Sequence, residues 1–296
     1  MPLQHVLALT DFSTTGEQAL ERAAQVAASH GASLRLLYAA DRHDSKFSDP
    51  HARLDQRARQ LARRHGLQVR AVHGSGDALN DLDGLLRSTD LLVVDAARQR
   101  SLRGFWRGAT VAQLVRRHGC PVLVVKQAAA AGYRQVLVAV DLSRRSRALV
   151  GYAGAFEREA PLELFHALQS HGERHLRAAD VPLETLQSYR QAMTRQAHDR
   201  LLRLSTSFDT RRNRYRLAVN RGDPAYQASV QQQVSQADLM VVGKGRRHAL
   251  LDGWWPSLAW RLVGLAGCDV LVVPDHHRTP DQPQPLPAFA ENGSLG

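Results

Sequence analysis

Hydrophobic and polar positions along this chain follow a pattern best seen at residues 238–246, Asp-Leu-Met-Val-Val-Gly-Lys-Gly-Arg. The apolar run predicts a strand buried on both faces of a parallel sheet, followed by a loop that contains Gly243 and Gly245. In such sheets, ligands bind at the loops that follow the carboxyl ends of the strands. Residues 90–98, Asp-Leu-Leu-Val-Val-Asp-Ala-Ala-Arg, repeat the pattern at an offset of 148 residues. We therefore expect a duplicated protein.

Short apolar runs alternate with segments of helical spacing in both copies. Strands are expected at residues 6–10, 33–38, 69–72, 91–94 and 122–125, and again at 136–140, 162–167, 215–219, 239–242 and 270–273. Helices are expected in the first copy at 17–28, 54–65, 76–86 and 111–118. This alternation predicts a parallel α/β sheet in each copy.

The repeat divides the chain into two domains, residues 1–127 and 134–275, with a linker at 128–133. The first strand recurs at an offset of 130 residues and the fourth at 148, so the additional residues fall mainly in a helical segment between 173 and 207. Residues 276–296 are rich in proline and lack a hydrophobic period. We expect this tail to be disordered.

The duplication also predicts how the two domains meet. We expect two five-stranded parallel domains related by pseudo-twofold symmetry, with the strands around Val122 and Val270 at or near the interface, because pairing removes exposed apolar edges. Cys120 and Cys268 occupy matched places before these two strands. Small core residues are expected there, and not a disulfide, because the cytoplasm is reducing.

Composition and charge narrow the classes of function. Of 296 residues, 44% are hydrophobic and 23% are charged, as in an ordinary globular protein. The net charge of +11 is divided between residues 1–130 and 131–296, and nearly all the cations are Arg. Without an aromatic-rich β platform or a helix-turn-helix pattern, a solvated basic surface is favoured over a nucleic-acid binder. No apolar run is long enough for a membrane span and no leader pattern is present, so we expect a cytoplasmic protein.

Several features together resemble the universal stress protein family. They are the order of the elements, the Asp that closes the first strand of each copy, the Gly-Asp-Pro turn at 222–224, the Asp-Leu-(apolar)-Val-Val stretch and the final Cys-x-Val-Leu-Val-Val strand. The resemblance covers residues 3–126 and 134–274 and looks like the tandem type, in which two domains in one chain mimic the dimer of single-domain members. It implies α/β domains that are Rossmann-like and similar to adenine-nucleotide alpha hydrolases.

Nucleotide-binding members of that family carry Gly-x2-Gly-x9-Gly-(Ser/Thr) after the fourth strand. Glycines let the backbone approach the phosphates, and N–H groups at a helix N-terminus stabilise their charge. Asp95 in the first copy would place a carboxylate where the phosphates approach, and Pro256 in the second lacks a backbone donor. The resemblance thus implies degenerate loops in both copies, more so in the first. The spacing falls on Asp95, Arg98, Gly108 and Ala109, and on Gly243, Arg246, Pro256 and Ser257.

The substituted loops leave two interpretations open. Arg98 and Arg246 occupy matched positions, where guanidinium groups can bind phosphate or carboxylate without a glycine cradle, or simply bond to neighbouring carbonyls. Asp11 and Asp141 correspond to the family acid beside the nucleotide, but an Asp-x-Ser sequence also caps a helix without any ligand. The candidate ligand-binding residues are Asp11, Asp95, Arg98 and Gly108 in the first copy and Asp141, Gly243, Lys244, Gly245, Arg246 and Ser257 in the second.

No group of residues points to catalysis or to a metal. His171 and His175 lack further ligands for zinc, and the chain has no phosphate loop and no nucleophile turn. Together with the family resemblance, this leads us to expect a non-catalytic stress-response protein that acts through a small anionic ligand or an unknown protein partner, with no cofactor beyond weak ATP or another small anion in the second domain. The alternatives are an ATP-binding, slowly hydrolysing switch that uses the second domain, and a non-specific nucleic-acid binder. The two domains would form an intramolecular pseudo-dimer, and a homodimer of chains stays open.

Overall fold

The computed structural model describes residues 3–39, 48–74, 78–96, 117–129, 131–169, 181–208, 215–244 and 258–275. The predicted tail and most of the helix expected at 111–118 lie outside these residues. The strands are β1 (His5–Thr10), β2 (Ser33–Tyr38), β3 (Val69–Val72), β4 (Leu91–Asp95), β5 (Val122–Val125), β6 (Val136–Ala139), β7 (Leu162–Leu168), β8 (Tyr215–Arg221), β9 (Leu239–Lys244) and β10 (Asp269–Pro274). The helices are α1 (Thr14–His30), α2 (Pro50–His65), α3 (Ala78–Leu86), α6 (Ser146–Phe156), α8 (Leu183–Thr206), α9 (Pro224–Ser235) and α10 (Leu258–Leu265).

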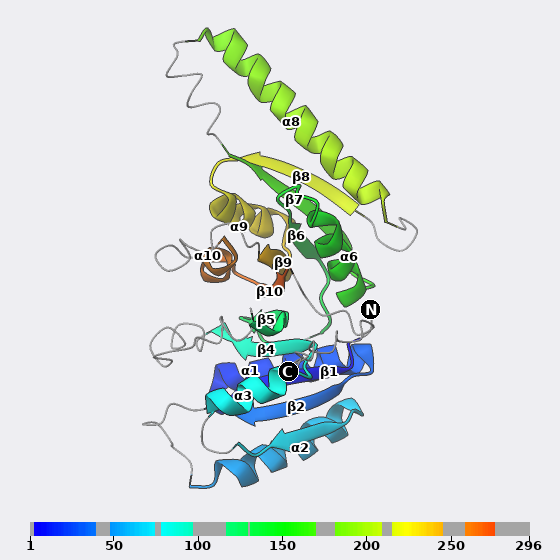
Figure 1. Ribbon diagram of the computed structural model, residues 1–296, viewed down its shortest axis with the longest axis vertical. Coiled ribbons are helices and arrows are strands. Elements are labelled where there is room, and N and C mark those ends of the chain that lie inside the picture. Colours follow the sequence, from blue (N-terminus) through cyan, green and yellow to red (C-terminus); the bar gives the residue numbers. More distant parts are fainter. Residues whose placement is uncertain are drawn as a thin grey trace, which may run out of the picture.

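All these strands form one ten-stranded sheet in the order β3-β2-β1-β4-β5-β10-β9-β6-β7-β8. We call β1 to β5 with their helices the first half, and β6 to β10 with theirs the second half (Figure 1). The strand order is the same in each half when read inward from its outer edge, as pseudo-twofold symmetry requires. Pairing is parallel within each half, whereas β5 and β10 pair antiparallel, with Leu123 opposite Leu271. The predicted α/β fold and the meeting of the two terminal strands are confirmed, and the two parallel sheets are joined into one.

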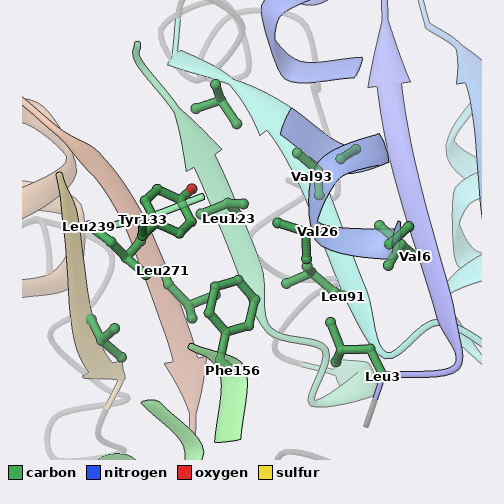
Figure 2. Packing of buried hydrophobic residues seen from close by; sticks show 14 of the residues in the cluster. Leu3, Val6, Val26, Leu91, Val93, Leu123, Tyr133, Phe156, Leu239 and Leu271 are labelled. Atoms are coloured by element: carbon green, nitrogen blue, oxygen red, sulfur yellow. The ribbon is translucent and has the colours of Figure 1, made fainter. Parts of the chain in front are cut away.

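Helices cover both faces of the sheet, and a hydrophobic core lies under each layer. One core packs side chains of α1, α2, α6 and α8 against the strands, and the other packs side chains of α3, α9 and α10. Both cores contain residues of both halves. Figure 2 shows this continuity, with Leu123 and Leu271 beside Tyr133 of the connecting segment, Phe156 of the second half and Val26 of the first.

The helix boundaries follow from side-chain caps and glycines. Ser13 caps α1 through its hydroxyl, which accepts a hydrogen bond from the N–H of Gly16, and this cap starts the helix three residues before the predicted Glu17. Gly31 ends α1 in the left-handed conformation at φ 66°. Asp223 caps α9, with Pro224 in the first turn, so the Gly-Asp-Pro sequence opens a helix as expected.

The second half differs from the first mainly in α8. This helix has 24 residues, whereas its counterpart α2 has 16. Only one of its faces is buried, through Leu186, Ala197, Leu201 and Ser205. In Figure 1, α8 lies at the end of the molecule opposite α2. Eight of the additional residues of the second copy therefore lengthen a helix at the outer edge, and the order of the strands at the centre of the sheet is the same in both halves.

Candidate functional site

In the first half, the predicted site residues Asp11 and Asp95 are connected through hydroxyl groups. Asp11 Oδ1 accepts hydrogen bonds from the N–H of Ser13 at 2.9 Å and from its hydroxyl at 2.6 Å. The Ser13 hydroxyl lies 3.2 Å from that of Thr15, which in turn donates to Asp95 Oδ1 at 3.3 Å. Asp95 is 1% exposed. The ends of β1 and β4 are therefore joined by a chain of polar side chains.

Asp11 thus positions the residue that caps α1 and is not the cap itself. Ser13 caps α1, and the carboxylate of Asp11 fixes the position of that serine. Phe12, between them, has a left-handed backbone at φ 62°, and Leu142 repeats this conformation in the second half at φ 58°. Such a conformation is uncommon for residues with a side chain, so both halves use the same constrained turn where the first strand ends.

In the second half, Asp141 occupies the place of Asp11 and keeps the equivalent backbone contact, but the hydroxyl that donates to it belongs to Ser146. Its Oδ1 accepts from the N–H of Ser143 at 2.9 Å and from the hydroxyl of Ser146 at 3.0 Å. Partial burial acts to raise the pKa of Asp141, but hydrogen bonds from Ser143 and Ser146 outweigh it and hold the pKa below its usual range. The group is therefore an ionised carboxylate at neutral pH and a weak proton acceptor.

Gly243 ends the buried part of β9 at the position that Asp95 holds in β4. A Cβ atom at Gly243 would lie 3.4 Å from Leu149 Cδ2, in ordinary contact. Leu149 belongs to α6, and its counterpart in α1 is the smaller Ala19, which is fully buried. The two halves therefore combine large and small residues in opposite ways, with Ala19 and Asp95 in one and Leu149 and Gly243 in the other.

Not all predicted site residues can be placed. Lys244 is the last residue of β9, and its backbone lies opposite Pro274 of β10. Gly245, Arg246 and Ser257, as well as Arg98 and Gly108, lie outside the described residues.

Two further side chains lie at the strand ends of the second half and were missed in the sequence. His166, near the end of β7, bonds through Nδ1 to the carbonyl of Val140 at 2.8 Å, and burial lowers its pKa. Arg200 of α8 donates to the carbonyl of Leu142 at 2.7 Å. Both therefore border the turn that carries Asp141. The position of His166 at the end of a strand was a usable signal, whereas nothing in the sequence distinguished Arg200 from other arginines of a long helix.

Metal-binding groups and membrane-spanning helices were looked for in the described part of the chain. No group of three or more His, Cys, Asp or Glu side chains there is arranged to hold a metal ion. None of the described helices is both long and apolar enough to cross a bilayer.

Comparison with known proteins agrees with this fold. A protein of unknown function from Pseudomonas aeruginosa PAO1 shares 19% identity and a TM-score of 0.61, and the match covers 92% of each chain. A universal stress protein from Archaeoglobus fulgidus DSM 4304 shares 14% identity and a TM-score of 0.59, over 92% of this chain and 98% of that one. At these identities the similarity concerns the fold. No curated protein matches the sequence.

The family comparison covers both halves of the chain. The model of the universal stress protein family matches residues 2–126 and again residues 132–274. These two matches coincide with the two sets of strands that meet at β5 and β10. The chain therefore belongs to the universal stress protein family and carries two copies of its domain in tandem.

Proposed function

We propose that this protein is a non-catalytic stress-response protein whose second domain binds a small anionic ligand, while its first domain has a structural role. The observation that carries the proposal is the difference between Asp95 and Gly243 at equivalent strand ends. Asp95 is buried and bonded to Thr15, so it brings a carboxylate to the first site. Gly243 brings neither charge nor bulk to the second site.

Electrostatics explain why this difference selects the second domain. A buried carboxylate repels an anion strongly, because little solvent screens the interaction. In the second domain, Gly243 lets the backbone approach a ligand, and the nearby Lys244 and Arg246 are cations in the sequence. Arg246 and Pro256 replace two of the family glycines, so ATP binds more weakly in our proposal than in a loop built of glycines.

The proposal of a binding protein also follows from the state of Asp141. A general base works best when its pKa lies near the operating pH, whereas the pKa of Asp141 is held below the usual carboxyl range. Asp141 then serves as a fixed acceptor for a ligand hydroxyl and not as a proton carrier. We place the protein in the cytoplasm, where the buried thiols of Cys120 and Cys268 stay reduced.

Calorimetry with ATP and with other small anions, including inorganic phosphate, tests this function. We expect weak ATP binding at most. Binding of an anion should be lost in Gly243→Asp and reduced in Arg246→Ala, and it should persist in the matched control Asp95→Asn of the first domain.

Three results would contradict the proposal. Tight, stoichiometric ATP binding that disappears in Gly243→Asp would favour the nucleotide switch instead. Anion binding that is unchanged in Gly243→Asp but altered in Asp95→Asn would place the ligand in the first domain. Binding of DNA or RNA that weakens steeply from about 50 to 200 mM salt would favour the nucleic-acid binder.

A further inference from the structure

The two halves meet through strands that share one sequence. β5 reads Val-Leu-Val-Val and β10 contains the same four residues, and the strands pair antiparallel with Val124 opposite Val270 and Val122 opposite Val272. Neither the strand backbones nor these side chains distinguish a β5–β10 pair from a β5–β5 or β10–β10 pair between two copies. Any preference for the pair that is formed must come from residues beside this shared sequence.

A buried charged group lies at one end of this strand pair. Asp269 is fully buried, and its Oδ2 lies 3.2 Å from Arg22 Nε and accepts a hydrogen bond from the Tyr133 hydroxyl at 2.8 Å. The guanidinium of Arg22 also lies 4.4 Å from the centre of the Tyr133 ring. We call Arg22, Tyr133 and Asp269 the junction cluster. It combines a cation from the first half with an anion from the second.

The chain that connects the halves is bound to the same cluster. Asp269 Oδ1 accepts from the N–H groups of Lys126 at 2.8 Å and Gln127 at 3.1 Å. Arg22 donates from Nη1 to the carbonyl of Ala131 at 2.6 Å. Arg22 also donates to Gln25 Oε1 of its own helix at 3.1 Å, but its counter-charge, Asp269, comes from the other half.

The pseudo-twofold axis produces no second copy of the cluster. At the offset of 130 residues, Tyr152 takes the place of Arg22 and Leu3 that of Tyr133. At the offset of 148 residues, Pro121 takes the place of Asp269. Pro274 takes the place of Lys126 and has no N–H to donate. The other end of the strand pair therefore has neither the cation nor the anion.

We propose that the junction cluster makes the two halves complementary to each other and not to themselves, so that the β5–β10 surface accepts the partner half and rejects an identical half. Two first halves would leave Arg22 facing Pro121, and two second halves would leave Asp269 facing Tyr152. Each arrangement buries a charge without its counter-charge, which is strongly unfavourable. This inference concerns the pairing surface alone and is independent of any ligand.

The inference is tested by letting the two halves pair after the chain that connects them has been cut. A protease site is inserted between Ala130 and Ala131 of the full chain, the folded protein is cut, and the two pieces are unfolded in urea and refolded together. Because the pieces differ in mass, native mass spectrometry distinguishes mixed pairs from pairs of identical halves. We expect the wild-type pieces to form mixed pairs.

The informative variant is Arg22→Met with Asp269→Asn, which removes both charges and keeps an acceptor for the N–H groups of Lys126 and Gln127. Identical pairs should then increase at least about tenfold, towards the statistical half of all pairs, because no assembly leaves an unpaired buried charge. Arg35→Met is the matched control, since Arg35 bonds to Ser88 and Thr89 within the first half. It should retain mixed pairs.

Statistical pairing of the wild-type pieces would overturn the inference. So would mixed pairs alone in the double variant, once circular dichroism shows that it is folded. If the double variant does not fold, Asp269→Asn serves in its place. The appearance of pairs of second halves would then support the inference, and their absence would refute it.

Discussion

Asp90 and Asp238 form the same bonds in the two halves. Asp90 Oδ2 accepts hydrogen bonds from the backbone N–H groups of Gln4 and His5, both at 2.9 Å. Asp238 accepts from those of Arg134 at 3.0 Å and Gln135 at 3.1 Å. Each aspartate stands just before the fourth strand of its half and binds the chain as it enters the first strand. The Asp that opens both repeated stretches is therefore a structural residue at the amino ends of the strands.

Replacing either aspartate should reduce stability. Asp90→Ala and Asp238→Ala each remove two charge-assisted hydrogen bonds to the backbone, and we expect each to lower the free energy of unfolding by about 1–3 kcal/mol in urea titrations. Asp90→Asn retains an acceptor oxygen and should lose less. An equal loss in Asp90→Asn and Asp90→Ala would show that these hydrogen bonds are not the cause.

Gly16 should not tolerate a methyl group. A Cβ atom there would lie 2.7 Å from Asp11 Oδ1, which Ser13 holds in place through two hydrogen bonds. We expect Gly16→Ala to lower the free energy of unfolding by about 1–3 kcal/mol. Gly84→Ala is the matched control because a Cβ atom on that residue of α3 meets nothing within 4 Å, and it should stabilise the protein by up to about 1 kcal/mol. A stabilising Gly16→Ala would disprove the fixed position of Asp11.

The first half combines the small Ala19 with Asp95, whereas the second half combines the large Leu149 with Gly243. This difference predicts energetic coupling between residues 19 and 95. Ala19→Leu alone should overpack the first half and cost about 1–3 kcal/mol. In the Asp95→Gly background, which reproduces the Leu149 and Gly243 combination, the same substitution should cost less. A double-mutant cycle should therefore give a coupling free energy of at least about 0.5 kcal/mol.

Ala23 supplies the control for this cycle. Ala23 and its counterpart Ala153 are alanines in both halves and are fully buried. Ala23→Leu should be equally costly in the wild type and in the Asp95→Gly background. Additive effects of Ala19→Leu and Asp95→Gly would mean that the two positions accommodate their residues independently.

Acid should lower the stability of the folded protein through His30, a half-buried histidine where α1 meets α6. His30 Nε2 lies 3.0 Å from the carbonyl oxygen of Phe156. Burial lowers the pKa of His30 below its ordinary value of 6.5, against the hydrogen bond to Phe156, which acts to raise it. The folded state thus prefers the neutral ring, and this contribution to stability is present above pH 6.5 and is lost as the pH falls through the folded pKa.

Thermal unfolding of the wild type and of His30→Gln between about pH 8 and pH 5 measures this effect. His30→Gln keeps a side-chain donor without a titrating group, so the wild type should lose more of its Tm on acidification than the variant. Parallel pH profiles for the two proteins would exclude a role for His30.

The sequence predicted the strands and their grouping because a buried parallel strand requires an unbroken apolar run, as at residues 91–94 and 239–242. It also predicted the meeting of β5 and β10, since an uncovered apolar edge is unfavourable. The junction cluster was not predictable. Arg22 lies in a helix and is one of many arginines in the chain, where a solvated position is the usual expectation, and its counter-charge lies far away in the sequence.

The candidate site was predictable only in outline. The pattern identified Asp11, Asp95, Asp141 and Gly243 as residues at strand ends, and the structure places them there. Their partners were not predictable, because they depend on which hydroxyl groups of α1 and α6 reach each carboxylate. Thr15 reaches Asp95, whereas Ser146 reaches Asp141.

Because β5 and β10 pair antiparallel, the parallel strands of the first half point in the opposite direction to those of the second half. Every strand of one half runs against every strand of the other, so the carboxyl ends of the two sets emerge at opposite margins of the same sheet. The sheet therefore separates a molecule bound at one margin from a molecule bound at the other. The candidate ligand site of the second half and the matched strand ends of the first therefore open in opposite directions, and the tandem chain does not enclose them in one shared chamber.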